Sequence, residues 1–238
     1  MTYNHLDLFS GTHSWGKATH KRGIHTTSLD RDIGATDVLG KAYTSANHIQ
    51  EDILSWDYRV YPRGHFTLIT ASPVCTWWSV LRYSNIGRKI GDSDVRLTRD
   101  MIEDDIMQLG VPMIDRLFEI LEYFQPEYFV IENPQSGRLK EYIGELIPYR
   151  DVDYCKYGYE YRKRTRIWTN IPFEPRVCAG TCHHSTQMSR VTSGWGRNRF
   201  VRYRIPQELI ESLLECIEKE HKTQGCHTYH SKLGRTSC

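Results

Sequence analysis

Short apolar segments of strand length alternate with segments of helical periodicity along most of this chain, and this alternation limits the fold more than any other feature. Strand-like runs occupy residues 5–9, 24–29, 66–71, 128–131, 152–155 and 165–169, and helical segments occupy residues 14–21, 111–124 and 136–147. Strands that alternate with helices form a mostly parallel sheet with helices on both faces. The sequence therefore predicts a doubly wound α/β fold.

Composition and cysteine usage place this fold in a reducing compartment. The 238 residues suit one large domain, and no apolar run is long enough to span a membrane. The first residues lack a charged region followed by an apolar core, so no secretory signal is predicted. The seven cysteines are odd in number and widely spread, unlike a disulfide framework. We expect an intracellular, cytoplasmic protein without a membrane partner.

Positive charge is concentrated in one part of the chain. Residues 150–204 contain twelve Lys or Arg against four Asp or Glu, a net charge of +8, whereas the whole chain carries only +2. Such a local field suits a nucleic-acid backbone. A solvated basic face without a partner is the alternative interpretation.

Two further segments differ from the alternating pattern. Residues 82–110 are polar, contain three glycines and follow a candidate catalytic cysteine, so we expect a mobile active-site loop. A plain surface insertion with a short helix near residues 98–108 remains open. After residue 218 the chain is polar without a period, and the sequence predicts a disordered tail over residues 219–238. The domain would then span residues 1–218.

Chemically useful side chains follow the predicted strands at the points where they end. They are the run from Asp7 to Thr12, then Asp30, Asp52, Cys75 and Glu132. Open α/β sheets bind ligands beyond the carboxyl ends of their strands. Glycine permits a tight turn beneath a ligand, and an acid at the end of the second strand can accept hydrogen bonds from ribose. A structural role for each residue alone remains open, but their common placement predicts a site.

The order of these motifs resembles the carbon-5 cytosine methyltransferase family, most closely its compact members in phages and large DNA viruses. The resemblance covers residues 4–215. It rests on Asp7-Leu8-Phe9-Ser10-Gly11, Pro73-Val74-Cys75, Glu132-Asn133-Pro134, Arg164-Thr165-Arg166 and Tyr203-Arg204-Ile205-Pro206. Three positions depart from the family: Val74 replaces a proline, Pro134 replaces a valine, and Thr12-His13-Ser14 replaces a second loop glycine.

The resemblance implies the sheet of the S-adenosylmethionine-dependent methyltransferases, which is Rossmann-like, and S-adenosylmethionine as methyl donor. Phe9 would pack on the adenine, Gly11 would approach the methionine part, Asp30 would bind the ribose and Asp52 the adenine amino group. The segment around Ile205 would return to the donor pocket. The donor-binding set it implies is Asp7, Phe9, Ser10, Gly11, Thr12, Asp30, Asp52 and Pro73.

The resemblance also implies a catalytic set and a reaction. The Cys75 thiolate would add to carbon 6 of cytosine, Glu132 would hydrogen-bond or protonate ring nitrogen 3, and Arg166, with Arg164, would contact the oxygen at position 2. Carbon 5 would then take the methyl group. Its substrate would be double-stranded DNA with a flipped cytosine, because a stacked base cannot reach such a pocket.

Only residues 171–200 remain for target recognition, which is too few for a large domain. Arg190, Arg197, Arg199 and Arg202 could contact phosphates or base edges, and an accessory recognition protein could add specificity. We expect a monomer. Cys178, Cys182 and His183 are spaced as metal ligands, so a structural zinc is one interpretation, although polar surface residues without metal are favoured.

Three other functions are compatible in part. Methylation of RNA cytosine would use the same pocket, and a catalytically silent nucleic-acid-binding relative would keep the fold. Intact Cys75, Glu132 and Arg166 argue against the silent relative. Adenine amino methylation needs an Asp or Asn followed by Pro-Pro-aromatic, which the chain lacks.

Overall fold

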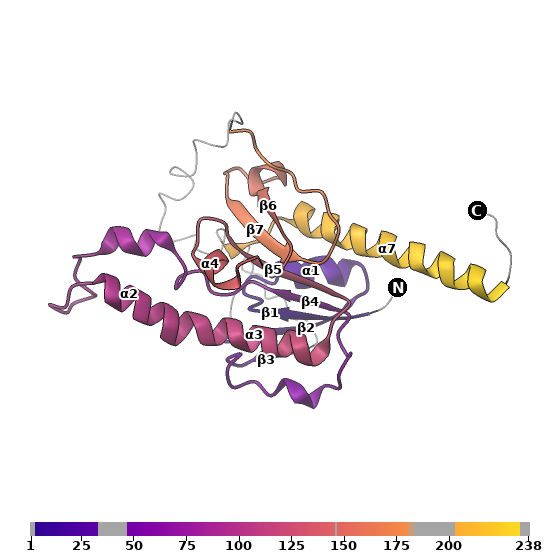
Figure 1. Cartoon of the computed structure of the whole chain (residues 1–238), viewed down its shortest axis with the longest axis horizontal. Helices are drawn as coiled ribbons and strands as arrows, with labels where there is room; N and C mark the ends of the chain where they lie inside the picture. Colours follow the sequence, from indigo (N-terminus) through magenta and orange to yellow (C-terminus); the bar gives the residue numbers. More distant parts are fainter. Residues whose placement is uncertain (1–2, 33–46, 146, 181, 183–202, 234–238) are drawn as a thin grey trace.

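The computed structural model describes residues 3–32, 47–145, 147–180, 182 and 203–233. Within these ranges a seven-stranded sheet has the order β3-β2-β1-β4-β5-β7-β6 (Figure 1). The strands are β1 Asn4–Leu8, β2 His25–Asp30, β3 Asn47–Gln50, β4 Leu68–Ala71, β5 Tyr128–Pro134, β6 Tyr149–Asp153 and β7 Arg164–Thr169.

The strand directions confirm the predicted doubly wound, mostly parallel sheet. β7 runs antiparallel to both of its neighbours, β5 and β6, and the other strand pairs are parallel. The chain winds outward from β1 to β3 and then returns to β4 on the other side of β1. Such a reversal of strand order leaves a crevice at the carboxyl ends of the central strands.

Helices cover both faces of the sheet, and strand residues alternate between the two faces (Figure 1). Tyr128 and Val130 of β5 pack in one buried cluster with α1 (Ser14–Lys21) and α7 (Gln207–Leu233). Ile131 belongs to the other cluster, which includes α3 (Val111–Phe124) and α4 (Leu139–Ile143). Because side chains alternate along a strand, each residue's position decides which helical layer it contacts.

The helix predicted over residues 136–147 is shorter than expected, covering only Leu139–Ile143. It ends at Gly144, whose φ of 64° cannot continue a right-handed helix. The helices predicted at residues 14–21 and 111–124 have the expected bounds.

Residues 82–110 contain more secondary structure than a plain loop. They include α2 (Arg99–Asp105), inside the range of the short helix that the alternative interpretation predicts, followed by a π-helical turn, Ile106–Gly110. The Arg138 side chain of the α4 N-terminus donates to Glu103 of α2 at 2.8 Å. This contact joins residues 82–110 to α4. The mobility of residues 82–110 stays a prediction.

Residues 219–238, for which the sequence predicts a disordered tail, include the continuation of α7 to Leu233, and the disorder of the tail stays a prediction. The chain has no proline between residues 207 and 233 that would end the helix. The His221 ring also stacks on Tyr3, with ring centroids 6.2 Å apart, and meets the Tyr128 ring edge-on at 5.5 Å. None of the helices in the described ranges is both long and apolar enough to cross a membrane.

Candidate active site

A cavity of about 710 Å³ lies at the carboxyl ends of the central parallel strands. Its wall contains every residue of the predicted donor-binding set together with two of the predicted catalytic residues. These are Asp7, Phe9, Ser10, Gly11, Thr12, Asp30, Asp52, Pro73, Cys75 and Glu132. The structure thus brings to one site residues that are up to 125 positions apart in the sequence.

The first loop of the cavity follows β1 and is held by the end of β2. The backbone N–H of Gly11 donates to Asp30 Oδ2 at 2.8 Å, and that of Ser10 donates to the Leu29 carbonyl at 3.1 Å. Gly11 has a φ of 46°, and the non-glycine residues Phe9 and His13 have φ values of 55° and 54°. His13 therefore takes a left-handed conformation in the segment where the family has a second glycine, at a cost in backbone strain.

Asp7 is a buried carboxyl group at the end of β1. Its Oδ1 accepts a hydrogen bond from the Thr70 hydroxyl at 2.9 Å, while Oδ2 has no partner among the residues that the structure describes. Burial raises the pKa of Asp7 from 3.8 to about 7. Thr70 also contacts the His5 ring. Burial lowers the pKa of His5 to about 3, so its imidazole is neutral. Asp7 thus offers the cavity a carboxyl group that can change its charge near neutral pH.

The half-buried Cys75 lies in a turn that begins after β4 and is fixed from both sides. The Asn133 side-chain amide donates to the Pro73 carbonyl at 2.9 Å, so the residue after Glu132 holds the loop that carries the thiol. Beyond the thiol, the Trp78 carbonyl accepts from the Arg138 N–H at 2.7 Å. The Trp78 ring is buried, and a Cβ on Gly110 would come within 3.0 Å of it, so this turn packs tightly against the helical layer.

Glu132 lies near the end of β5, almost fully buried, with two polar partners on one oxygen. The Tyr154 hydroxyl donates to Glu132 Oε1 at 2.8 Å, and Lys163 Nζ lies 3.4 Å from the same atom. Lys163 Nζ is also 4.8 Å from the Tyr154 ring centroid, and Lys163 lines the cavity. Burial and the adjacent Glu132 carboxylate raise the pKa of Tyr154 well above 10, so the phenol remains a donor.

Arg164 and Arg166 are not among the residues that line the cavity, and their contact with the substrate stays a prediction. Arg166 forms a two-point ion pair with Asp151 of β6, at 2.7 and 3.0 Å, and Arg164 pairs with Asp153 in the same way. The reason is the register of β7, in which Ile167 lies opposite Glu132. Residues 163, 165 and 167 therefore share the face of Glu132, and residues 164 and 166 point to the other face.

The segment before α7 returns to the donor side of the cavity, as the sequence predicts. Tyr203 and Ile205 line its wall, and the Ile205 N–H donates to Ser14 Oγ at the start of α1, at 3.2 Å. Asp52 also lines the cavity, and its Oδ1 accepts from the Leu54 N–H at 2.9 Å. The predicted nucleic-acid contacts Arg190, Arg197, Arg199 and Arg202 lie outside the described residues.

A curated protein of frog virus 3 (isolate Goorha), described as a "Probable DNA (cytosine-5)-methyltransferase", is 38% identical to the chain over 230 residues, covering 88% of this chain and 98% of that protein. The chain belongs to the DNA (cytosine-5)-methyltransferase family. No protein-family model matches it.

One solved methyltransferase structure shares the fold of this family member, and a second has a weaker similarity to it. The Entamoeba histolytica methyltransferase EhMeth has a TM-score of 0.50 at 16% identity, covering 74% of this chain and 56% of that one. The S. pombe Dnmt2 methyltransferase has a TM-score of 0.44 at 16% identity, covering 70% and 50%. The chain thus spans about half the length of the structures it matches.

Sequence reasoning missed two residues of this methyltransferase site, Tyr154 and Lys163. The alternation along residues 162–168 divides their side chains between two faces, but it does not say which face Glu132 shares. That depends on the pairing of β5 with β7, which only the structure supplies. The sequence favours the arginines of its most basic run as site residues. In the structure it is the lysine of that run, Lys163, that lines the cavity.

Proposed function

We propose that this protein transfers a methyl group from S-adenosylmethionine to carbon 5 of cytosine in DNA. The observation that carries the proposal is that Cys75, Glu132 and the loop from Phe9 to Thr12 line one cavity. A nucleophile, an acid and a donor-binding loop are then within reach of one bound base. The frog virus 3 relative, matched over nearly its full length, supports DNA cytosine as the substrate.

The donor side of the cavity fits S-adenosylmethionine. The volume of the whole cavity, about 710 Å³, is in the range of cofactor pockets. Asp7 Oδ2 is a buried acceptor with no partner in the described structure. The ammonium group of S-adenosylmethionine would donate a hydrogen bond to it. Phe9 would pack on the adenine, Gly11 would approach the methionine part, Asp30 and Asp52 would bind ribose and adenine, and Ser10, Thr12 and Pro73 would complete the wall. When bound, the donor supplies the methyl group.

Cys75 begins the reaction in this proposal. Its Sγ, as thiolate, adds to carbon 6 of cytosine and forms a carbon–sulfur bond, which breaks the aromaticity and makes carbon 5 nucleophilic. Carbon 5 would take the methyl group as the methyl–sulfonium bond of the donor breaks, which leaves a neutral thioether. A base such as water then takes the carbon-5 proton, and the carbon–sulfur bond to Cys75 breaks to restore the ring and the thiolate. The fixed turn between the Pro73 and Trp78 carbonyl contacts would hold Sγ in place through both steps.

Glu132 would hydrogen-bond or protonate ring nitrogen 3, because negative charge develops there when the thiolate adds. The Tyr154 and Lys163 contacts both fall on Oε1, so they orient the carboxyl group in its buried position. Lys163 also brings positive charge into the cavity, which stabilises the electron-rich adduct. We propose Lys163 for the electrostatic role that the sequence assigns to Arg166 and Arg164.

The remaining features of the proposal concern the substrate. The target cytosine would leave the duplex to enter the cavity, with residues 82–110 closing beside it. Arg190, Arg197, Arg199 and Arg202, which lie outside the described residues, would contact DNA, alone or with an accessory recognition protein. The protein would act as a monomer in the cytoplasm, which is that of the host cell if the protein is viral, where its thiols stay reduced.

The test uses duplex DNA in which 5-fluorocytosine replaces cytosine, incubated with the protein and S-adenosylmethionine. Fluorine at carbon 5 cannot leave as a proton does, so the enzyme should be trapped as a methylated covalent adduct. Denaturing electrophoresis and peptide mass spectrometry should place the adduct on Cys75. Cys75→Ser should give no adduct but bind S-adenosylmethionine as the wild type does, and Cys216→Ser, on α7, should be trapped normally.

Three outcomes would contradict the proposal. An adduct on RNA but not on DNA would assign the same chemistry to RNA cytosine. Donor binding without an adduct on either nucleic acid would indicate the silent relative. An adduct on a cysteine other than Cys75 would overturn the assignment of the nucleophile.

A further inference from the structure

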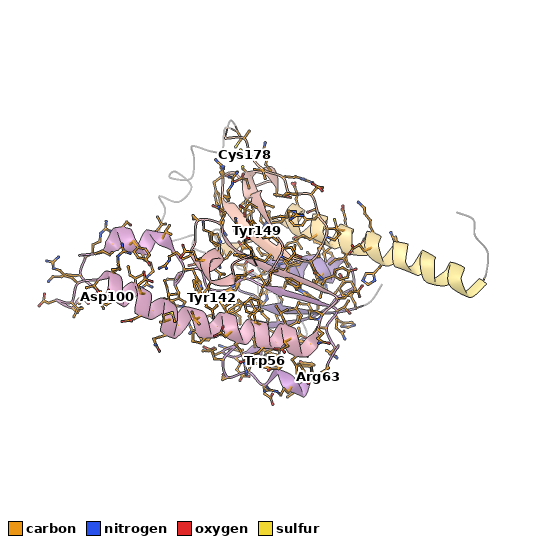
Figure 2. All side chains as sticks on the ribbon, in the orientation of Figure 1. Trp56, Arg63, Asp100, Tyr142, Tyr149 and Cys178 are labelled. Carbon is orange, nitrogen blue, oxygen red and sulfur yellow. The ribbon has the colours of Figure 1, made fainter. Side chains whose placement is uncertain are left out.

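Three cysteine thiols from two separate segments meet outside the active-site cavity. Cys155 belongs to the short helix η4 (Tyr154–Lys156) after β6, and Cys178 and Cys182 follow β7. The Cys182 sulfur lies 3.0 Å from that of Cys178 and 3.7 Å from that of Cys155, and all three lie within 4.8 Å of one another. Figure 2 shows the labelled Cys178 at the edge of the molecule, beyond the strand that carries Tyr149.

The sulfurs are close enough to share one soft metal ion. Zinc–sulfur bonds of about 2.3 Å in tetrahedral array place neighbouring sulfurs about 3.8 Å apart. The separation of 3.7 Å between Cys182 and Cys155 matches this value, whereas the 3.0 Å between Cys182 and Cys178 would have to widen when the ion binds. A disulfide would need two sulfurs at about 2.05 Å and would leave the third thiol over. In the structure none of the three cysteines forms a disulfide.

The backbone around the cluster is arranged for the thiols independently of any metal. The N–H of Gly180 points at Cys178 Sγ with a separation of 3.4 Å, and Gly180 has a φ of 86°, which allows the tight turn between the two cysteines. The Cys178 N–H donates to Asp153 Oδ2 at 2.8 Å, and Asp153 is itself paired with Arg162 and Arg164. The ends of both segments are therefore fixed before a ligand binds.

We propose that Cys155, Cys178 and Cys182 bind a structural zinc ion. Three thiolates select zinc over the oxygen-preferring ions magnesium and calcium. Among the residues described, no fourth His, Cys, Asp or Glu joins the cluster. His183, which the sequence suggests as a ligand beside Cys178 and Cys182, lies outside the described residues. The proposal does not depend on the reaction catalysed.

The ion would act as a clamp between β6 and the chain that follows β7. Cys155 is adjacent to Tyr154, whose hydroxyl donates to Glu132, and Cys182 belongs to residues 171–200, the segment that remains for target recognition. Metal binding would hold η4, and with it the Tyr154 contact to Glu132. A small, loop-rich region gains such stability from a metal where it has little core of its own.

The experiment measures zinc in the full-length protein, purified with a thiol reductant and without chelators. Inductively coupled plasma mass spectrometry should find about one zinc ion per chain. Cys155→Ser, Cys178→Ser and Cys182→Ser should each lower that content severalfold or more. The matched control is Cys216→Ser, a half-buried cysteine on α7 outside the cluster, which should keep the wild-type content.

A second measurement on the wild-type protein avoids variants that fail to fold. Alkylation with iodoacetamide, mapped by mass spectrometry, should modify Cys155, Cys178 and Cys182 only after zinc is removed, and added zinc should restore protection. Cobalt in place of zinc should give the thiolate charge-transfer band of a sulfur-rich tetrahedral site. Together these results would support the site even if every variant aggregates.

Three results would overturn the proposal. The first is wild-type protein that holds no zinc even after incubation with the ion. The second is a Cys178–Cys182 disulfide in protein whose thiols were blocked at lysis, without bound metal. The third is full zinc content in Cys155→Ser, which would remove Cys155 from the site.

Discussion

At the scale of single residues, Asp7 shows how the end of a buried strand creates a group with unusual chemistry. One carboxyl oxygen accepts from Thr70, and the other has no partner in the described part of the chain. Because burial disfavours the charged form, the pKa of Asp7 rises to about 7. The folded protein therefore keeps this carboxyl group protonated under conditions in which the unfolded chain ionises it.

Asp7→Asn should make stability less dependent on pH. In the wild type, unfolding lets Asp7 ionise above pH 3.8, so the free energy of unfolding falls as pH rises from about 4 to about 7 and then levels off. The variant lacks this loss and should be more stable above pH 7, by up to about 4 kcal/mol. Urea unfolding of both proteins at several pH values between 4.5 and 8 measures the difference. A difference that is constant across this range would contradict the prediction.

At the scale of elements, β7 separates two tasks by its two faces. Lys163 shares the face of Glu132 and lines the cavity, whereas Arg166 points to the other face and pairs with Asp151. The Arg166 guanidinium also stacks on the Tyr149 ring at 3.7 Å. One strand thus supplies charge to the site on one side and joins β6 on the other.

Exchanging each of these two side chains for methionine should separate the tasks. Lys163→Met should lower kcat about 100-fold, because it removes charge from the cavity, and should leave Tm nearly unchanged. Arg166→Met should lower Tm, because Asp151 loses its two-point partner, and should leave the rate of the folded protein near that of the wild type. Methyl-transfer assays and thermal unfolding of both variants measure the two effects. An inactive but stable Arg166→Met variant would return the catalytic role to Arg166.

The same strand shows what the sequence can and cannot predict. Cys75, Glu132 and Asp30 were found because strand ends in a parallel sheet meet at one edge, a rule that needs only the order of strands. Lys163 and the Cys155 thiol were missed because they depend on strand register and on contacts between distant segments. The helical extent of the last segment was also missed, since it has little apolar periodicity and ring contacts from distant residues help to hold it.

At the scale of the whole molecule, α7 completes one face of the sheet. Its apolar side buries Leu209, Ile210, Leu213, Leu214 and Ile217. Glu218 pairs with Arg22, next to α1, at 3.1 Å, and His221 contacts two rings. Figure 1 shows the last turns of the helix projecting beyond the sheet. Stability should therefore depend on the first half of α7.

Two truncations should show this division. Ending the chain after Lys222 should change Tm by no more than about 3 °C, because the buried contacts remain. Ending it after Pro206 removes five buried aliphatic side chains, worth about 10 kcal/mol, which is comparable to the whole stability of a domain. That chain should not fold. Circular dichroism melting measures both, and a folded short chain or an unfolded long one would contradict the prediction.

The position of Tyr203 and Ile205 on the cavity wall also has a consequence for protein synthesis. Both residues, and the helix that follows them, leave the ribosome after all seven strands. A nascent chain that has already paired β7 with β5 still lacks part of the cavity wall and the α7 part of the helical layer that α1 begins. Ligand binding therefore cannot assist the early steps of folding. The cavity wall is completed only after all seven strands have been synthesised.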